Sequence, residues 1–408
     1  MTNQSDKLGI LILTGESNQS IPLRSQLAEV YGENIVRYGH KVKVILSTAN
    51  SERPEKFNWN GIEFYRVPVG KRLVRARLIW QIIKEGNIDI LQVRQGAVDC
   101  IISLFIRRRQ RLPVVIQYTW PEWEAARQRY QRKRRYFNAG YWKVRITDFL
   151  QIKAMQNADL ILPISEQMGE YLIKRGIPRQ RVLPFMDGVN PEKFTPEISC
   201  DEIKTRFGLC DSPVLVYQGT MARIRQLEIL MYAFSRVVKQ WQEAKLLMVG
   251  EGDGRKDIHK LADGLGIGNS VVFTGRVAYE EVPKYIAASD IALCPIPPLY
   301  LYKLSSPLKL FEYMAVAKPV VANEEIPEQK ETLEQSGGGI LAQFTPEAFA
   351  DAIIELLDNP EKAHEMGQKG RKWVVRNRRY EILARRIEQV YYQLLVRKQD
   401  ARNIRNTH

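Results

Sequence analysis

The chain has 408 residues, of which 45% are hydrophobic and 26% are charged. These values are typical of a folded protein of two or three domains, and they exclude a collagen-like, disordered or multi-span membrane protein. Lys and Arg outnumber Asp and Glu by 61 to 46, and the resulting charge of +15 favours an anionic partner such as nucleic acid, an anionic membrane or a phosphorylated ligand.

Short apolar runs alternate with helical patterns along the first half of the chain. A strand is expected at 8–13, followed by a helix that begins near Ser20 and Pro22 and ends at Gly39, because Pro fits a first helical turn and Gly ends a helix. Five more strands are expected at 41–47, 62–67, 89–93, 114–119 and 159–165. Continuous Val, Ile and Leu runs separated by helices predict a parallel sheet covered on both faces.

The same alternation repeats in the second half of the chain. Its expected strands lie at 213–219, 245–250, 271–275, 291–296, 319–323 and 338–343. Between the halves, residues 186–198 contain Gly, two Pro and no periodicity, which predicts a domain boundary near residue 197. The expected fold class is α/β with two doubly wound, Rossmann-like units, and such sheets bind ligands at the carboxyl ends of their strands.

The basic charge lies in two segments. Residues 107–145 contain twelve Lys or Arg and two Glu, and residues 369–405 contain twelve Lys or Arg and three acidic residues. The rest of the chain is slightly acidic, so the basicity belongs to these segments and not to the body of the protein.

Cysteine and histidine are sparse. The four Cys show no Cys-x-x-Cys spacing and only four His are present, so neither a metal site nor a cofactor is expected. The apolar run near the N-terminus is too short for a signal peptide, and no stretch approaches 18 apolar residues. These features predict a cytoplasmic protein with reduced thiols.

One segment combines phosphate-binding and ribose-binding residue types. In 305–323, Ser305 or Ser306 can cap a helix and Pro307 suits its first turn. Lys309 also falls in the first turn, and Glu312 follows one turn later. A helix N-terminus and a lysine attract phosphate, while a carboxylate accepts hydrogen bonds from two neighbouring hydroxyls. The alternative is that the motif simply begins a helix and that Glu312 is solvated.

This segment resembles the signature helix of the family 4 glycosyltransferases of GT-B fold. Other segments resemble the family in order and spacing: 39–47, 158–178, 188–196, 217–234, 248–254, 271–295 and 378–395. The resemblance implies two Rossmann-like domains facing across a cleft. It implies an acceptor-binding domain at 1–197, a nucleotide-sugar-binding domain at 198–377, and a C-terminal helix at 378–408 that returns to the first domain.

The resemblance also implies the activity, which is transfer of a sugar from a nucleotide-sugar to an acceptor with retained anomeric configuration and without a metal. The chain has no Asp-x-Asp motif. By resemblance, Arg225 and Lys309 bind the donor diphosphate and Glu312 holds the ribose, although the family's loop lysine aligns with either Arg225 or Gln226. The other implied donor-binding residues are Gly219, Arg223, Arg276, Val277, Ser306 and Leu308.

The sequence departs from the family pattern at two positions. A second glutamate is common eight residues before the ribose glutamate, and here that residue is Leu304. The family also often has a histidine after the fourth strand, where this chain has none, so Thr119 or a backbone carbonyl would take its role. Gly15 and Arg94 are the other candidates on the acceptor side, and the alternative for Arg94 is a surface or inter-strand ion pair.

Two rival functions come from other classes. The departures at Leu304 and near Thr119 are compatible with a non-catalytic GT-B partner subunit, although Lys309 and Glu312 are kept. The net charge is compatible with a nucleic-acid-binding protein, but the sequence lacks the usual nucleic-acid-binding signatures. We therefore expect no nucleic-acid partner.

Aromatic residues recur beside basic ones within 107–149. Trp123, Tyr130 and Phe137 are seven residues apart and precede Tyr141 and Val144, which predicts one apolar stripe on a helix. The basic neighbours are Arg127, Arg129, Arg132, Lys133, Arg134 and Arg135. Such a segment suits an anionic membrane surface and predicts a peripheral enzyme on the inner face of the cell membrane with a lipid-linked or membrane-resident glycan acceptor. The alternative is that the stripe packs on the domain core.

Overall fold

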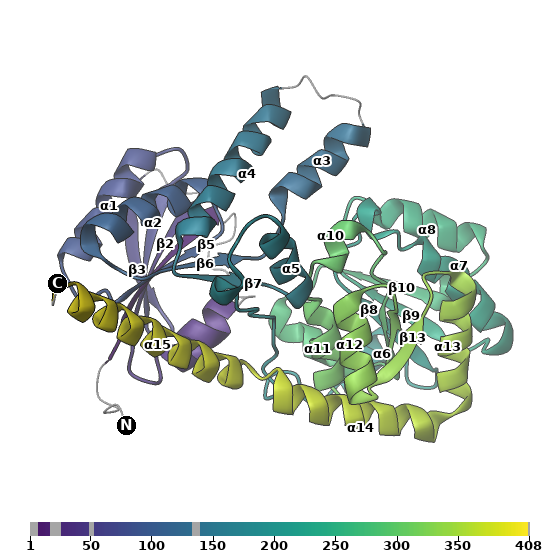
Figure 1. The fold of residues 1–408 in the computed structure, drawn as a ribbon. Coiled ribbons are helices and arrows are strands. Elements are labelled where there is room, and N and C mark those ends of the chain that lie inside the picture. Colours follow the sequence, from purple (N-terminus) through teal and green to yellow (C-terminus); the bar gives the residue numbers. More distant parts are fainter. Residues whose placement is uncertain (1–6, 17–25, 49–52, 133–138, 407–408) are drawn as a thin grey trace. The chain divides into compact units, whose positions relative to one another are not determined.

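The computed structural model describes residues 7–16, 26–48, 53–132 and 139–406, and the chain forms two compact units (Figure 1). The first unit comprises residues 1–186 together with 380–408, and the second comprises 187–379. The boundary expected near residue 197 lies inside the second unit, a short way along the chain from its start.

The first unit contains a seven-stranded sheet in the order β3-β4-β2-β1-β5-β6-β7. Its strands are β1 (Gly9–Glu16), β2 (Lys41–Thr48), β3 (Glu55–Trp59), β4 (Ile62–Pro68), β5 (Ile90–Arg94), β6 (Val114–Tyr118) and β7 (Leu160–Pro163). All neighbours are parallel except β3, which is antiparallel to β4. The six strands expected from the apolar runs are confirmed.

The edge strand β3 was not predicted. It is joined to β4 by Asn60 and Gly61, both with positive φ angles of 45° and 73°, which is the Asn-Gly turn that favours a tight hairpin. Phe57 on β3 stacks on Phe64 of β4 with 5.1 Å between ring centroids. The Asn-Gly dipeptide between alternating aromatic residues was the sequence signal for this strand.

Helices cover both faces of this sheet (Figure 1). One face carries α1, α2 and α4, and the other carries η1 and α15, which pack on the same core. The helical segments are η1 (Leu27–Ile35), α1 (Arg72–Lys84), α2 (Ala97–Gln110), α3 (Glu122–Arg132), α4 (Ala139–Asn157), α5 (Glu166–Lys174), η2 (Arg179–Arg181) and α15 (Tyr380–Asn406). The expected helix start near Ser20 lies outside the described residues, and η1 is wound as a π-helix.

The single aromatic stripe predicted across 123–144 is wrong. The structure has two helices here, and Trp123 on α3 packs against Tyr141 on α4 with ring centroids 5.3 Å apart. On one straight helix these residues would be separated by about 27 Å. Pairing the two helices buries aromatic surface that a single helix would leave exposed. Phe137 and the basic residues at 133–135 lie outside the described residues.

A buried polar network attaches the C-terminal helix α15 to the first unit. The hydroxyls of Tyr31 on η1 and Tyr391 on α15 lie 3.0 Å apart, and both donate to the side-chain carbonyl of Gln92 on β5. All three residues are buried, so each polar group needs its partner. The predicted return of the C-terminal helix to the N-terminal domain is confirmed.

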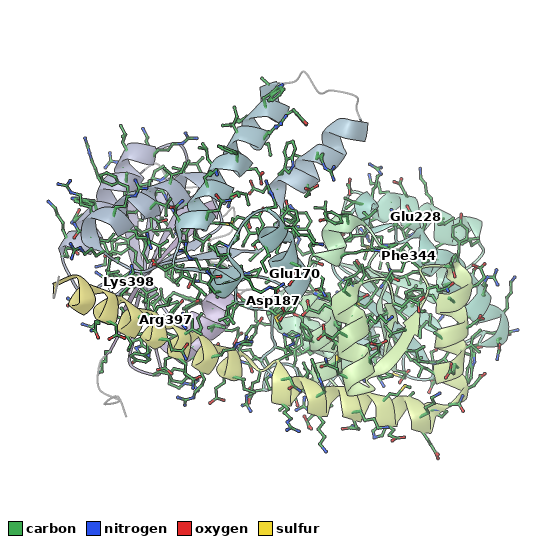
Figure 2. The ribbon with its side chains drawn as sticks, in the orientation of Figure 1. Glu170, Asp187, Glu228, Phe344, Arg397 and Lys398 are labelled. Carbon is green, nitrogen blue, oxygen red and sulfur yellow. The ribbon has the colours of Figure 1, made fainter. Side chains whose placement is uncertain are left out.

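A hydrogen bond and an ion pair extend the attachment of α15. The backbone N–H of Leu8 donates to Nδ1 of His40, so Nε2 carries the proton that faces Glu388 of α15 at 2.7 Å. Near the other end of the helix, Lys398 lies 3.2 Å from the carboxylate of Asp159 (Figure 2).

The second unit contains a six-stranded parallel sheet in the order β10-β9-β8-β11-β12-β13. Its strands, all six expected from sequence, are β8 (Val214–Gln218), β9 (Lys245–Val249), β10 (Val271–Gly275), β11 (Ile291–Cys294), β12 (Val320–Asn323) and β13 (Gly339–Ala342). Its helical segments are α6 (Asp201–Phe207), η3 (Arg223–Arg225), α7 (Glu228–Gln240), α8 (Arg255–Gly264), η4 (Gly268–Ser270), η5 (Tyr279–Glu281), α9 (Val282–Ala287), α10 (Tyr300–Lys303), α11 (Leu308–Ala315), α12 (Pro327–Ser336), α13 (Pro346–Asp358) and α14 (Pro360–Asn377).

A buried ion pair holds the carboxyl ends of β1 and β2 in the first unit. The guanidinium of Arg75 on α1 contacts both carboxylate oxygens of Asp99 on α2 at 2.9 and 2.7 Å. The same guanidinium donates to the backbone carbonyls of Thr14 and Ile45 at 2.9 and 3.2 Å. This one side chain therefore ties two helices to two strand ends.

We expect Asp99→Ala to lower the free energy of unfolding of the first unit by about 3–5 kcal/mol, because it leaves the Arg75 charge buried without its partner. Urea denaturation followed by circular dichroism measures the change. Glu170→Ala is the control, since Glu170 forms an exposed pair with Arg179 worth at most about 1 kcal/mol. Equal effects of the two substitutions would contradict the structural role of Asp99.

Candidate functional site

The candidate site of the second unit begins where β8 ends. Gly219 has a φ angle of 143°, and a Cβ there would lie 2.7 Å from the ammonium nitrogen of Lys309. Its backbone N–H donates to the carbonyl of Val249 at 2.9 Å, and a Cβ on Gly250 would lie 2.0 Å from the Gly219 carbonyl oxygen. Glycine is required at both positions for these loops to approach each other and to leave room for Lys309.

Lys309 lies in the first turn of α11, as the sequence predicts. Its ammonium nitrogen sits 4.2 Å from the ring centroid of Tyr217, and in the described part of the chain no carboxylate is within ion-pair distance of it. Burial lowers the pKa of Lys309 to about 8, and the positive charge of Arg225 adds to this effect. The first N–H groups of α11 have no side-chain cap, so they also remain available to an anion.

The two arginines of the loop after β8 have different surroundings. Arg225 lies with its guanidinium carbon 4.6 Å from the ring centroid of Tyr302, and among the described residues it has no carboxylate partner. Arg223 instead pairs with Asp257 of α8 at 2.8 Å. The structure therefore brings Arg225 and Lys309 together and engages Arg223 elsewhere.

Glu312 is buried, with 1% of its surface exposed, so the alternative of a solvated Glu312 is wrong. One carboxylate oxygen accepts from the hydroxyl of Tyr279 at 2.8 Å, and the other accepts from the side-chain amide of Gln218 at 3.2 Å. Neither partner was predicted from the sequence. Tyr279 lies in the loop after β10, shortly after Arg276 and Val277. The nucleobase contacts implied for those two residues were the sequence signal nearest to Tyr279.

The remaining donor-side residues surround the start of α11 and the end of β10. Leu308 begins α11. The Ser306 hydroxyl donates to Glu328 at 3.0 Å and lies 3.4 Å from the backbone nitrogen of Asp187. Burial raises the pKa of Glu328 to about 8. Leu304 is buried, so the position at which the family often has a glutamate is occupied by core packing.

The acceptor-side candidates lie at one edge of the sheet in the first unit. Arg94 ends β5 and is paired in register with Thr14 of β1, the residue before Gly15. The Thr119 hydroxyl after β6 donates to the side-chain carbonyl of Gln95 at 2.9 Å. The carboxyl ends of β1, β5 and β6 therefore bring Gly15, Arg94 and Thr119 to the same edge, where this fold type places its ligands.

Two family models match the chain. Residues 28–186 match the glycosyl transferase 4-like domain, and residues 201–373 match glycosyl transferases group 1. Together the two matches account for most of the chain and follow the division into two units. The chain belongs to the family 4 glycosyltransferases of GT-B fold, as the sequence resemblance indicated.

The chain is similar to several known glycosyltransferases. It is 23% identical over 231 residues to alpha-D-kanosaminyltransferase of Streptomyces kanamyceticus, covering 55% of this chain and 58% of that protein. It is 27% identical over 203 residues to the GDP-mannose-dependent alpha-(1-6)-phosphatidylinositol monomannoside mannosyltransferase of Mycobacterium tuberculosis, covering 49% of this chain and 53% of that protein. The matches therefore span little more than half the length of these relatives.

Among solved structures, the fold is similar to that of HepE from Anabaena in complex with UDP. The TM-score is 0.70 at 14% identity, and the match covers 95% of this chain and 100% of that chain. At 14% identity this similarity is evidence for a shared fold alone.

We expect the affinity for a nucleoside diphosphate to fall as the pH rises through about 8. Below that value the Lys309 ammonium is charged and attracts the ligand, and above it the neutral amine does not. Calorimetry should show binding about tenfold weaker at pH 9 than at pH 7. Lys309→Arg keeps its charge and should not show this decrease. If the affinity of the wild type stayed constant between pH 7 and 9.5, Lys309 would not be a ligand-binding cation.

Proposed function

We propose that the protein transfers a sugar from a nucleotide-sugar to an acceptor and that the donor binds to the second unit. The observation that carries this proposal is the pair of neighbouring cations, Arg225 and Lys309, which have no carboxylate partner among the described residues and lie beside the uncapped start of α11. The UDP bound by HepE and the GDP-mannose dependence in the name of the mycobacterial relative support a nucleoside diphosphate sugar as donor.

In this proposal each donor group meets a chemically matched part of the site. The diphosphate lies against Arg225, Lys309, the N–H groups near Leu308 and the backbone of Gly219. The ribose hydroxyls donate to Glu312. The remaining contacts involve residues with smaller roles. The nucleobase reaches the backbone of Arg276 and Val277, and the sugar reaches Ser306. Arg223 is paired with Asp257 and would reach the diphosphate only after leaving that pair.

The proposed chemistry depends on charge that develops during bond breaking. Negative charge grows on the diphosphate as its bond to the anomeric carbon breaks, and Arg225 and Lys309 stabilise it without reorganising. Holding the acceptor hydroxyl beside the donor lowers the entropic part of the barrier. We propose that the acceptor attacks from the face that the diphosphate leaves, with retention of configuration, and that the leaving phosphate takes the acceptor's proton, without a metal.

Lys309→Ala and Arg225→Ala should each lower turnover roughly 100- to 1000-fold, because each removes one charge that stabilises the leaving group. Donor hydrolysis and transfer in a purified sample provide the measurement, and circular dichroism checks the fold. Gln226→Ala is the matched control in the same loop and should retain most of the activity. If both charge variants keep turnover within threefold of the wild type, neither residue belongs to the site.

Glu312→Ala should weaken binding of UDP or GDP itself, because ribose hydroxyls are left without an acceptor in a partly dry site. Tyr279→Phe is the control, and it should not weaken nucleotide binding. It removes the hydroxyl that occupies one Glu312 oxygen while keeping the ring packed on Phe194, 5.6 Å away, so nucleotide affinity should be equal or higher. Calorimetry measures both variants. An unchanged affinity for Glu312→Ala would exclude the ribose assignment.

We further propose that the acceptor is a lipid-linked or membrane-resident glycan and that the enzyme acts at the inner face of the cell membrane through residues 107–149. In the described part of the chain no helix is long and apolar enough to span a bilayer. Support comes from the exposed side chains of Arg108, Arg109, Lys143 and Arg145 and of Trp142. The phosphatidylinositol in the name of the mycobacterial relative supports a lipid acceptor.

A further inference from the structure

The outer faces of α1, α2 and α4 form a surface that is both apolar and basic, here called the basic–apolar face. Helix α2 packs against α4, and Trp80 of α1 lies 6.5 Å from Phe105 of α2, ring centroid to ring centroid. Leu73 and Phe105 are 77% and 62% exposed. The large hydrophobic side chains exposed on this face are Leu73, Val74, Val98, Ile101, Phe105, Trp142, Ile146, Phe149 and Leu150. Exposed apolar surface on this scale marks an interaction site.

The exposed charges on these three helices are positive, while the exposed carboxylate of Glu85 follows directly after α1. Only two carboxylates occur on the three helices, all of whose residues are described, and both are buried: Asp99 pairs with Arg75, and Asp148 pairs with Arg175. The exposed cations are Arg72, Arg77, Lys84, Arg108, Arg109, Lys143, Arg145 and Lys153. Apolar side chains mixed with unopposed cations are the composition that binds an anionic bilayer surface.

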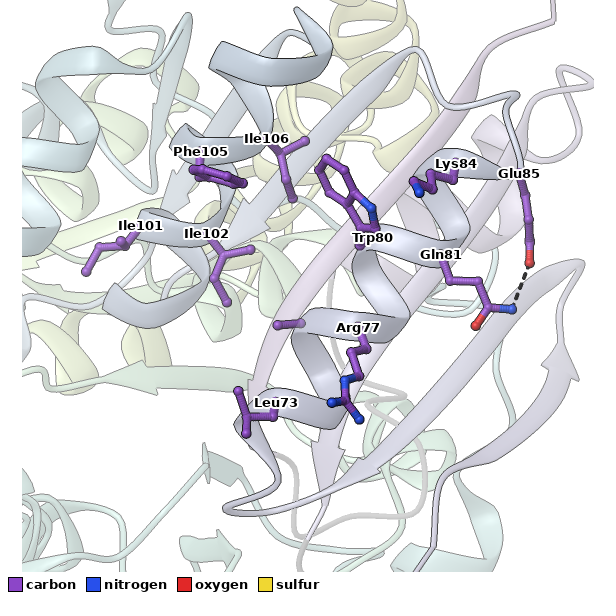
Figure 3. Close-up of a pocket in the computed structure, with 11 residues that line it drawn as sticks. Leu73, Arg77, Trp80, Gln81, Lys84, Glu85, Ile101, Ile102, Phe105 and Ile106 are labelled. Carbon is purple, nitrogen blue, oxygen red and sulfur yellow. Dashed lines mark hydrogen bonds between the residues drawn. The ribbon is translucent and has the colours of Figure 1, made fainter.

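A groove of about 780 Å³ runs between α1 and α2 on this face (Figure 3). Leu73 and Trp80 line its α1 side, and Ile101 and Phe105 line its α2 side. Lys84 lies at its margin, with its ammonium nitrogen 5.8 Å from the Trp80 ring centroid. Arg77 also lines the groove, and Glu85 lies next to Lys84, 3.9 Å from the ammonium nitrogen of Lys43. The groove therefore combines an apolar interior with two cations and one paired carboxylate at its margin, and the cations suit the anionic headgroup of a lipid whose chain lies in the groove.

We propose that this groove takes one hydrocarbon chain of an anionic lipid when the basic–apolar face lies on a bilayer. The proposal rests on the membrane-resident acceptor proposed above and adds a binding site that lies on α1 and α2. A second copy of this chain is a poorer occupant, because eight exposed cations would face eight others. Single-stranded nucleic acid is also poorer, because bases stack on aromatic rings and most of the apolar residues that line the groove are aliphatic.

The groove also reaches the acceptor edge of the sheet. Leu73 is the second residue of α1, and α2 begins at Ala97, three residues after Arg94 ends β5. A chain lying along the groove would thus run from this edge, near Leu73, to Lys84 at the other end of α1, where the ammonium faces the headgroup. One hydrocarbon chain together with a basic patch is the pair of signals that stable but reversible membrane anchoring needs.

Quenching of Trp80 by brominated lipid chains tests the groove directly. The protein is mixed with phosphatidylglycerol vesicles whose chains carry bromine, in a Trp142→Phe background that removes the exposed tryptophan of α4. We expect quenching in this background and its loss when Trp80→Phe is added. Equal quenching in both proteins would overturn the proposal, since Trp80 would not contact lipid chains.

A second arm measures affinity for the same vesicles by co-sedimentation. Phe105→Asp should weaken binding about tenfold or more, since it places a carboxylate in the groove. Val396→Asp is the matched control, because Val396 is a similarly exposed apolar residue on α15, on the opposite face of the sheet, and should leave affinity unchanged. Equal affinity of Phe105→Asp and wild type would overturn the proposal, as would a concentration-dependent dimer that Phe105→Asp abolishes.

The same variants separate this proposal from the proposed function. Phe105→Asp should bind UDP or GDP as the wild type does, because the donor residues lie in the second unit. A wild-type protein that binds vesicles through Trp80 but neither binds nor hydrolyses a nucleotide-sugar would overturn the proposed function and leave the groove in place. A protein that hydrolyses the donor but shows no Trp80 quenching would overturn the groove proposal and leave the proposed function in place.

Discussion

The candidate donor site depends on two like charges that are held close together without an acidic partner in the described chain. Arg225 and Lys309 repel each other, and burial lowers the pKa of Lys309. The rings of Tyr302 and Tyr217 offset part of this cost through their negative faces. Among the described residues no carboxylate lies within ion-pair distance of either cation, so both charges can attract an anionic ligand. Gly219 adopts a φ angle of 143° and also leaves space for the ammonium.

The first unit follows the opposite principle, since its buried charges are paired. Arg75 is fully engaged by Asp99 and by strand-end carbonyls, and Asp148 is engaged by Arg175. Pairing Asp99 and Asp148 inside the unit leaves cations as the exposed charges of α1, α2 and α4, with the exposed Glu85 just after α1. The same contacts that stabilise the sheet edge therefore also determine the sign of the surface charge on the basic–apolar face.

Sequence reasoning performed best where a feature depends on neighbours along the chain. Within the described residues it located twelve of the thirteen strands, because a buried parallel strand is a continuous apolar run. It missed β3, a short and half-exposed edge strand with no such run. It also placed Lys309 and Glu312 on one helix, because they are three residues apart. The single helix across 123–144 was wrong, because two antiparallel helices can share an aromatic pattern that looks continuous in sequence.

The sequence by itself determined the fold class and the placement of Lys309 and Glu312 on one helix, since both follow from local pattern and spacing, and its motifs carried the resemblance that indicated the family. Only the tertiary structure decided which charges remain unpaired. Arg223 and Arg225 are chemically identical, yet Asp257, 34 positions from Arg223, engages only the first. Tyr279 and Gln218 reach Glu312 from other strand ends. Pairing and exposure arise from contacts between residues distant in sequence, and local periodicity contains no information about them.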